Sequence, residues 1–257
     1  MGALLELQGV NKWFSGVHAL RNINFRLNKG EVVAILGDNG AGKSTLIKVI
    51  SGLHRPESGK LRVRGKPVSW QQYDVNRARA LGVETVYQER SLAEKQPVWR
   101  NLFVGRHLRN RFGFIDMAKE KRITARLLKQ IGLRGVGISP DSPVSVLSGG
   151  ERQGLAIGRA MHFDADIIIL DEPTNALSLG ETSKVLSFIR QIRDSGRSCI
   201  LICHTMAHVY EVADRYVFVD RGEVCYECNA DEVTLESLGQ QLIAIARGEY
   251  THKERTQ

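Results

Sequence analysis

The chain has 257 residues, 42% of them hydrophobic, and a net charge of +8, which suits one domain with a sizeable core. No apolar run approaches the roughly 18 residues that a bilayer-spanning helix needs, so any membrane association is expected to require a partner. Basic residues crowd between Arg100 and Arg134 without a nucleic-acid-binding motif. A solvated helical face is therefore favoured over a nucleic-acid surface, and no nucleic acid is expected as a partner.

The N-terminal part of the chain predicts an antiparallel sheet. Alternation of apolar and polar residues indicates β-strands at residues 4–10 and 23–27, and a further strand at 60–63 in the 59–65 turn region. Two adjacent aromatic residues, Trp13 and Phe14, follow the first of these strands.

A glycine-rich loop follows a short apolar strand at residues 31–36 and precedes a helix predicted over 42–51. It fits the phosphate-binding pattern G-x-x-x-x-G-K-[ST], in which backbone N–H groups and a helix N-terminus surround phosphate oxygens. The expected nucleotide-binding residues are Gly37, Asp38, Asn39, Gly40, Ala41, Gly42, Lys43, Ser44 and Thr45. In this pattern Lys43 contacts the β- and γ-phosphates, and the Ser44 hydroxyl binds Mg²⁺.

The middle of the chain is predicted to be helical. A strand at 83–87 ends at Gln88, and helical periodicity follows, most clearly over 117–132. The sequence Leu-Ser-Gly-Gly-Glu-Arg-Gln at 147–153 then opens a helix predicted over 151–161. Ser148, Gly149 and Gly150 would lie at the N-terminus of that helix, which is a second possible anion site.

Two carboxylates end a buried strand predicted at 167–170. Because ligands bind at the carboxyl edge of a parallel sheet, both side chains are expected at that edge. Asp171 is expected to hold Mg²⁺, through water. Glu172 lies one residue further, points elsewhere, and could polarise an attacking water as a catalytic base.

The remaining elements complete an α/β pattern. Helices are predicted at 181–195 and 234–247, and strands at 198–203, which is followed by His204, and at 216–219. With 31–36, 83–87 and 167–170, these strands form a mainly parallel sheet. A single C-x-x-C pair at 225–228 lies on a strand-like segment after a turn at 221–222. A metal site is not favoured there, because zinc sites usually use four ligands; reduced thiols are expected at Cys199, Cys203, Cys225 and Cys228.

Together, the motifs at 37–45, 147–153 and 167–172 resemble those of the nucleotide-binding subunits of ATP-binding cassette (ABC) systems, from about residue 4 to about residue 247. The resemblance implies a P-loop NTPase cassette with a mainly parallel core sheet, an antiparallel β-subdomain and a helical subdomain. A single ATPase domain over 1–257 is expected, with 1–88 and 162–257 forming the core and the β-subdomain. Residues 89–161 would form the helical subdomain.

The resemblance also implies roles for individual residues. Gln88 would contact Mg²⁺ and the attacking water, and His204 would reach the γ-phosphate; with Glu172 and Lys43 they are the expected catalytic residues. Phe14 would stack on adenine, with the adjacent Trp13 as its rival. Ser148, Gly149 and Gly150 would contact the ATP of a second copy in a head-to-tail dimer.

One position departs from the common pattern of the family. Many cassettes read Ser-Ala-Leu-Asp after Glu-Pro-Thr, whereas this chain reads Asn-Ala-Leu-Ser at 175–178. The missing aspartate belongs to a loop that couples the two sites of the dimer, so Ser178 puts that coupling in doubt. Hydrolysis is still expected, because Glu172 and His204 are present, and this argues against an inactive module.

Around residues 88–106 and 204–209 the chain is similar to the cassettes of monosaccharide importers of the ribose, xylose and fructose type. The implied function is hydrolysis of ATP, with Mg²⁺, to drive an integral membrane permease that receives its sugar from an extracytoplasmic binding protein. The chain would then lie on the cytoplasmic face of the inner membrane. The alternatives are a cassette of another importer, such as one for branched-chain amino acids, and a soluble ABC-type assembly ATPase.

Overall fold

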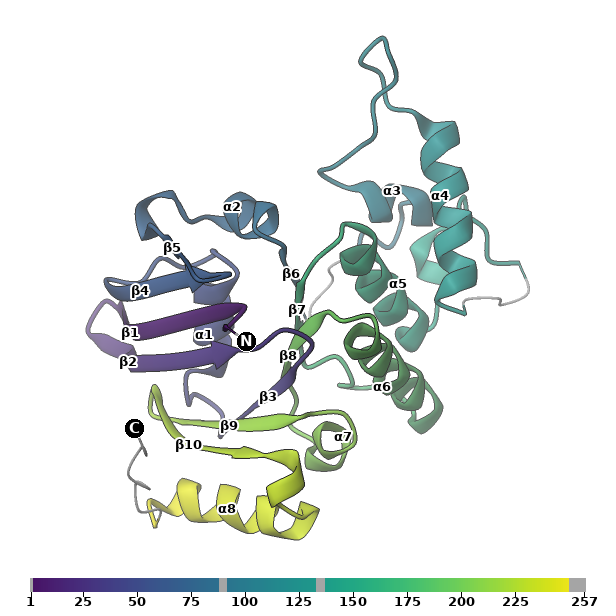
Figure 1. Cartoon of the computed structure of the whole chain (residues 1–257). Helices are drawn as coiled ribbons and strands as arrows, with labels where there is room; N and C mark the ends of the chain where they lie inside the picture. The colour runs from purple at the N-terminus through teal and green to yellow at the C-terminus, as the bar shows by residue number, and fades with distance from the viewer. Residues whose placement is uncertain (1, 88–91, 133–136, 250–257) are drawn as a thin grey trace.

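Two β-sheets and a set of flanking helices make up the computed structural model, which describes residues 2–87, 92–132 and 137–249 (Figure 1). The smaller sheet is antiparallel, with strand order β2-β1-β4-β5. Its strands are β1 (Leu5–Phe14), β2 (Val17–Leu27), β4 (Ser58–Val63) and β5 (Lys66–Val68). The predicted antiparallel sheet is therefore confirmed.

β1 continues four residues beyond its predicted end at residue 10, to Phe14. The additional residues close a hairpin with β2, in which Trp13 pairs with His18 and Phe14 with Val17. Register shifts after Leu7 and Val10 interrupt the alternation of side chains. Because the strand is predicted from the alternation of apolar and polar residues, its last four residues, 11–14, were not predicted.

The larger sheet has six strands in the order β10-β9-β3-β8-β7-β6. The five strands from β9 to β6 pair in parallel, and β10 is antiparallel to β9. The mainly parallel core sheet is therefore confirmed, with β10 as an addition. The strands are β3 (Val32–Leu36), β6 (Val83–Val86), β7 (Ile167–Asp171), β8 (Ser198–Ile202), β9 (Arg215–Asp220) and β10 (Glu223–Asn229).

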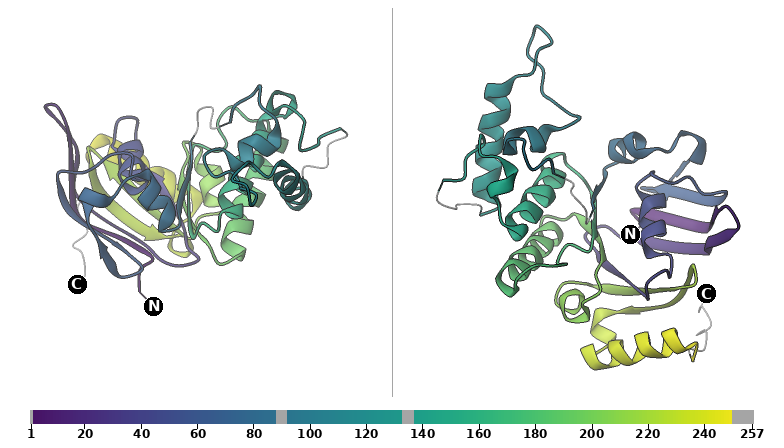
Figure 2. Two further views of the ribbon diagram at one scale, coloured as in Figure 1. Left: turned by 90° about the horizontal axis from the view of Figure 1, so that it is seen from above. Right: turned by 180° about the vertical axis from the view of Figure 1, so that it is seen from behind.

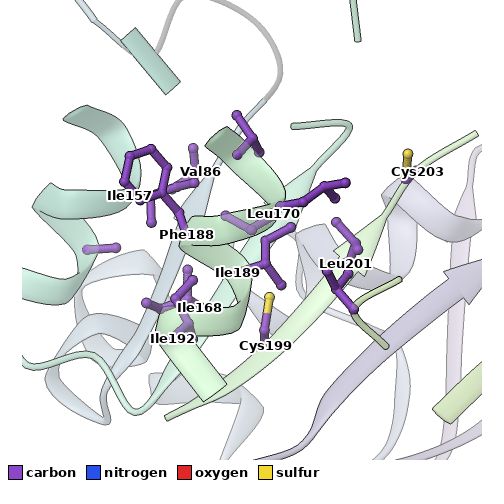
Figure 3. Packing of buried hydrophobic residues seen from close by; sticks show 14 of the residues in the cluster. Val86, Ile157, Ile168, Leu170, Phe188, Ile189, Ile192, Cys199, Leu201 and Cys203 are labelled. Carbon is purple, nitrogen blue, oxygen red and sulfur yellow. The ribbon is translucent and has the colours of Figure 1, made fainter. Parts of the chain in front are cut away.

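The central strand β3 is buried on both faces, and its alternate residues belong to two different hydrophobic clusters. Val33 and Ile35 pack in the cluster that includes the first helix, whereas Val32, Ala34 and Leu36 pack in the cluster that includes α5 and α6. Figure 3 shows the second cluster, in which Ile168 and Leu201 of the sheet lie near Phe188 and Ile189 of α6. Helices on both faces explain why these strands read as continuous apolar runs.

The helices predicted from sequence are all present, with ends within about two residues of the expected positions. Two short helices, α2 and α7, were not predicted, and α3 lies in the region of predicted helical periodicity without having been given bounds. The helices are α1 (Lys43–Ile50), α2 (Val75–Ala80), α3 (Val98–Phe103), α4 (Met117–Gln130), α5 (Gly149–His162), α6 (Leu179–Asp194), α7 (Met206–Tyr210) and α8 (Leu235–Arg247). Single 3₁₀ turns occur at Trp70–Gln72, Val144–Val146 and Ala230–Glu232.

Helices α3, α4 and α5 pack against one another and extend to one side of the six-stranded sheet, whereas the antiparallel sheet and α1 lie on the other side (Figures 1 and 2). Asn101, which is buried, ties α3 to the preceding loop by accepting a hydrogen bond from the Ala93 N–H (2.6 Å) and donating to the Ala93 carbonyl oxygen (3.1 Å). Within the described residues, no helix is both long and apolar enough to cross a bilayer.

All four cysteines are free and buried. Cys225 and Cys228 lie on β10, where burial raises the pKa of each thiol to about 11. The Cys225 thiol donates to the Phe218 carbonyl oxygen at 3.3 Å. The C-x-x-C pair is thus part of the packing between β10 and β9.

Candidate nucleotide-binding site

The glycine-rich loop at 37–45 connects β3 to α1, as the phosphate-binding pattern predicts. All three of its glycines have backbone angles that favour glycine, with φ +148° at Gly37, +80° at Gly40 and +110° at Gly42, and two of them also pack closely. A Cβ on Gly37 would overlap the Val219 carbonyl oxygen, and one on Gly42 would lie 3.0 Å from the Ala19 carbonyl oxygen. Both glycines are therefore required for the loop to pack against its neighbours.

Lys43 is the first residue of α1, and its ammonium group lies within the loop. Its Nζ donates to the carbonyl oxygens of Gly37 (2.8 Å) and Asp38 (2.7 Å). Burial lowers the pKa of Lys43, an effect opposed by the negative charges of Asp38, Glu172 and Asp171. The loop thus presents a partly desolvated cation, which suits binding of an anionic phosphate.

Asp171 is the last residue of β7, at the carboxyl edge of the sheet, opposite Ile202 of β8. Burial raises the pKa of its carboxyl group, and the neighbouring Glu172 carboxylate raises it further, whereas Lys48, Lys43 and His204 oppose the shift. Two acids and a desolvated site favour a bound cation here. Carboxylate and hydroxyl oxygens are the ligands that Mg²⁺ prefers, so Asp171 and Ser44 fit that metal.

The described residues contain no cluster of three or more His, Cys, Asp or Glu side chains with metal-binding geometry. Mg²⁺ in nucleotide sites is commonly held by one or two protein groups together with phosphate oxygens and water. Asp171 as a single protein carboxylate ligand, together with the Ser44 hydroxyl, is consistent with that arrangement.

Glu172 leaves the strand in a left-handed conformation, with φ +50°. Its N–H donates to the Ile202 carbonyl oxygen at 2.8 Å, which keeps the residue beside the end of β8. Its carboxylate accepts a hydrogen bond from Asn175 Nδ2 (3.2 Å) and lies 2.7 Å from His204 Nε2. The structure therefore brings Glu172 and His204, predicted from segments 32 residues apart, into direct contact.

One cavity of about 410 Å³ is lined both by the phosphate loop and by the Glu172–His204 pair. This volume lies within the range of small-molecule and cofactor sites. Lys43, Ser44, Glu172 and His204 all line it, so most of the predicted catalytic and phosphate-binding groups face one space. Its lining residues are Val17, His18, Ala19, Arg21, Asn39, Gly40, Ala41, Gly42, Lys43, Ser44, Thr45, Glu172, His204, Arg221 and Gly222.

Some lining residues were not predicted from sequence. Ala19 and Arg21 come from β2, and Arg221 and Gly222 come from the turn between β9 and β10. No local motif marks these residues, because only the fold brings their segments to the loop. Asn175 was also missed as a partner of Glu172, although its position three residues later could have suggested the contact.

Gly37 and Asp38 line a second cavity, of about 300 Å³, on the α8 side of the loop. His204 lies between the two cavities and contributes to both. Within the phosphate loop, Asp38 Oδ1 accepts a hydrogen bond from the Asn39 N–H at 3.0 Å. Gln88, predicted to contact Mg²⁺ and water, lies outside the described residues.

The segment Ser148–Gly150 does not line the cavity that contains Lys43. Ser148 is the N-cap of α5, and its hydroxyl accepts from the Glu151 N–H while Glu151 accepts from the Ser148 N–H, which forms a capping box. α5 and α1 belong to the clusters on opposite faces of the sheet. These residues could bind an anion, but one bound outside their own phosphate loop.

The two candidate adenine-stacking residues point to different neighbours. The Phe14 ring meets His54 edge to face at 5.1 Å, and Lys12 Nζ lies 5.1 Å from the Phe14 centroid. The Trp13 ring instead stacks on His18 at 3.9 Å, and His18 lines the cavity. Of these rings only His18 lines the cavity, and neither Trp13 nor Phe14 does.

Phe14→Ala is expected to weaken ATP binding more than Trp13→Ala does. Loss of an aromatic stacking contact of about 0.5–1.5 kcal/mol corresponds to a dissociation constant raised roughly 2- to 13-fold. Isothermal titration calorimetry on both variants measures the effect. A larger loss in Trp13→Ala would assign the stacking role to Trp13, supported by its contact with His18.

Asp171→Asn is expected to raise the melting temperature of the nucleotide-free protein at neutral pH. The pKa of Asp171 is higher in the folded chain than in the unfolded chain, so folding favours the protonated carboxyl. Stability from this residue is present at low pH and is lost as pH rises from the unfolded pKa through the folded pKa. At neutral pH the ionised group thus destabilises the fold, and the amide removes that effect.

The test is thermal unfolding in EDTA at pH 7, with the exposed Asp231→Asn as the control for loss of one charge. A lower melting temperature for Asp171→Asn than for Asp231→Asn would contradict the assignment of Asp171 as a destabilised, cation-seeking acid.

Comparisons with known proteins agree with this geometry. Residues 20–175 match the family model described as ABC transporter. The chain is 40% identical to the xylose/arabinose import ATP-binding protein of Sulfolobus acidocaldarius, over 99% of this chain and 100% of that protein. It is 34% identical to the ribose import ATP-binding protein of Caldanaerobacter subterraneus subsp. tengcongensis, over 95% of this chain but only 48% of that longer protein.

Solved structures share the fold. A nucleotide-free ATP-binding cassette from an ABC transporter superposes with a TM-score of 0.82 at 23% identity, covering 95% of this chain and 99% of that one. The ADP conformation of an ATP-binding cassette gives a TM-score of 0.81 at 23% identity, covering 97% and 100%. With the family match and the 40% identical relative, these results show that the chain belongs to the ABC transporter family, as an ATP-binding cassette.

Proposed function

We propose that this cassette hydrolyses ATP as a subunit of an ABC importer and that the imported substrate is a monosaccharide. The observation that carries the proposal is the convergence of Lys43, Glu172 and His204 on one cavity, with the Ser148–Gly150 segment placed outside it. The sugar-import names of the two relatives described above support the substrate class.

ATP binding is assigned to the glycine loop and the N-terminus of α1. Backbone N–H groups from Asn39 to Thr45 would surround the phosphates, and Lys43 would exchange its two carbonyl partners for phosphate oxygens. Ser44 and Asp171 would hold Mg²⁺, with Gln88 as a further ligand. When bound, the metal ion neutralises charge on the phosphates.

Glu172 is assigned as the group that orients and polarises the attacking water. Its contacts with His204 and Asn175 hold the carboxylate at the edge of the cavity, which reduces the number of orientations it can adopt. His204 can also reach the terminal phosphate, because it lines the same space. This arrangement separates the roles of two adjacent acids, with Asp171 for the metal and Glu172 for the water.

A head-to-tail dimer would complete the site with Ser148, Gly149 and Gly150 of a second copy. A charge-assisted hydrogen bond contributes about 1.5–3 kcal/mol, so two sites with two or three such contacts each give roughly 6–18 kcal/mol. Association costs about 4–15 kcal/mol. Because the two ranges overlap, the terms nearly balance, so losing the contacts to the terminal phosphate would tip the dimer open, and ATP would act as the closing signal.

Closure of the dimer would drive an integral membrane permease, which receives its sugar from an extracytoplasmic binding protein. The cassette would then lie on the cytoplasmic face of the inner membrane, held there by the permease. We also propose the division into a core at 1–88 and 162–257 and a helical subdomain at 89–161, whose relative movement would accompany closure.

The test is affinity capture of the Glu172→Gln chain from detergent-solubilised native membranes with ATP, followed by mass spectrometry. A multi-span permease together with a sugar-binding protein supports the proposal. An amino-acid-binding protein would identify another importer, and soluble partners alone would favour an assembly ATPase. Capture with ADP in place of ATP is the control for dependence on the closed state.

A further inference from the structure

The start of α6 packs unusually close to the start of α5. A Cβ on Gly149 would lie 2.8 Å from Leu177 Cδ2, and a Cβ on Gly150 would lie 2.8 Å from Glu181 Cβ. Neither glycine has a positive φ, so these glycines are required by the closeness of α6 rather than by their own backbone angles. The segment expected to bind nucleotide in trans is therefore in direct contact with the segment that follows Glu172.

The Glu181 carboxylate bridges the two segments. Its Oε1 accepts the Gly150 N–H at 3.1 Å, and its Oε2 accepts the Ser178 N–H at 3.1 Å and the Ser178 hydroxyl at 2.9 Å. These hydrogen bonds, with a further one from the Ser148 hydroxyl, lower the pKa of Glu181 to about 2. The side chain is thus an anion throughout the physiological pH range.

The Glu181 carboxylate accepts an N–H of α5 that the proposed function assigns to the phosphate of a nucleotide. Gly150 lies in the first turn of α5, where the free N–H groups and the helix dipole favour negative charge. The same N–H would donate to the terminal phosphate of ATP bound to the second copy. A single N–H cannot make two full hydrogen bonds, and a carboxylate at this place also repels phosphate.

We propose that the Glu181 carboxylate is an internal anion at the N-terminus of α5, which the terminal phosphate of a nucleotide on a second copy must displace before the dimer closes. The inference rests on the proposed head-to-tail dimer. Glu181 acts through Gly150 and is a positioning residue, not a catalytic one. It also places a negative charge one turn after Ser178, the position where many family members carry the aspartate that this chain lacks.

The test is Glu181→Gln, made in a Glu172→Gln parent so that ATP remains bound. Glutamine has a single acceptor oxygen, which can replace Oε2 and accept from Ser178, so the capping box of α6 is retained. The amide NH2 that then faces Gly150 cannot accept its N–H, so the charge and the competing acceptor are removed together. Removing a charge next to a helix terminus changes an anion's affinity by roughly 2- to 5-fold. With two equivalent sites, the dimer dissociation constant at low salt is expected to fall roughly 4- to 25-fold.

Analytical ultracentrifugation with ATP measures that constant, and Glu236→Gln, in the first turn of α8, is the control for loss of an equal charge. Glu181→Ala, which also removes the Glu181 half of the capping box on α6, is expected to dimerise more tightly than the parent despite a lower melting temperature. An unchanged or weaker dimer in Glu181→Gln would overturn the inference. Failure of the Glu172→Gln parent itself to dimerise with ATP would instead count against the proposed function.

Discussion

Glu172→Gln is expected to bind ATP with the affinity of the unmodified protein and to lose nearly all multiple-turnover hydrolysis. The amide keeps the shape of the side chain and can still contact His204, but it cannot polarise a water as a base. General-base groups contribute about 10²- to 10⁴-fold to rate, so a loss in that range is predicted. A phosphate-release assay and calorimetry on the same preparation measure the two quantities.

The matched control is Glu236→Gln, an exposed change of the same type in α8. Its turnover should equal that of the unmodified protein. Turnover in Glu172→Gln close to this control would contradict the assignment of Glu172 and would shift the role of base to another group in the cavity.

Lys43→Ala is expected to lose most of its affinity for ATP while keeping its fold. The ammonium is positioned by two carbonyl oxygens of its own loop and faces the cavity, so its principal role is recognition of phosphate. Two charge-assisted contacts at about 1.5–3 kcal/mol each predict a dissociation constant raised more than 100-fold. Calorimetric titration with ATP and Mg²⁺ measures the loss.

Lys48→Ala on the same helix is the control, because Lys48 lies near Asp171 without lining the cavity. It should lower the affinity much less than Lys43→Ala. Equal affinity in the Lys43→Ala variant and the unmodified chain would contradict the identification of the phosphate-binding loop.

The sequence predicted the elements that form continuous apolar runs or carry dense motifs. Burial of a strand and the periodicity of a long helix both show as a pattern in consecutive residues. This pattern predicted the buried strands β3, β7 and β8 and the long helices α4, α5 and α6. The helices α2, α3 and α7 have only five or six residues each, too few to show a period. β10 was recognised only as a strand-like segment at 225–228, because it is an edge strand of the sheet, where a half-exposed pattern is weaker.

The sequence predicted those site residues that belong to a recognisable local motif. Lys43, Ser44, Asp171 and Glu172 follow from local patterns, whereas His18 and Arg221 reach the cavity only because β2 and the β9–β10 turn pack against the loop. Ser178 and Glu181 show the same limit. Their spacing matches a capping box, but the contact from Glu181 to Gly150 depends on the packing of α6 against α5 and has no signature in either segment.

The composite site is tested most directly by mixing two variants that are each defective in a different half. Lys43→Ala removes the phosphate contact. Ser148→Asp keeps a good N-cap for α5 but places a negative charge where the partner's terminal phosphate would bind. A mixed dimer contains one intact site, formed by Lys43 of the second variant and Ser148 of the first, and one site with both defects.

Single-turnover ATP hydrolysis is measured for each variant alone and for their equimolar mixture, at a protein concentration that favours dimers. The account predicts negligible hydrolysis by either variant and clear hydrolysis by the mixture. A mixture no more active than the sum of its components would contradict a site shared between two copies. Full activity of Ser148→Asp alone would show that the segment at the N-terminus of α5 takes no part in hydrolysis.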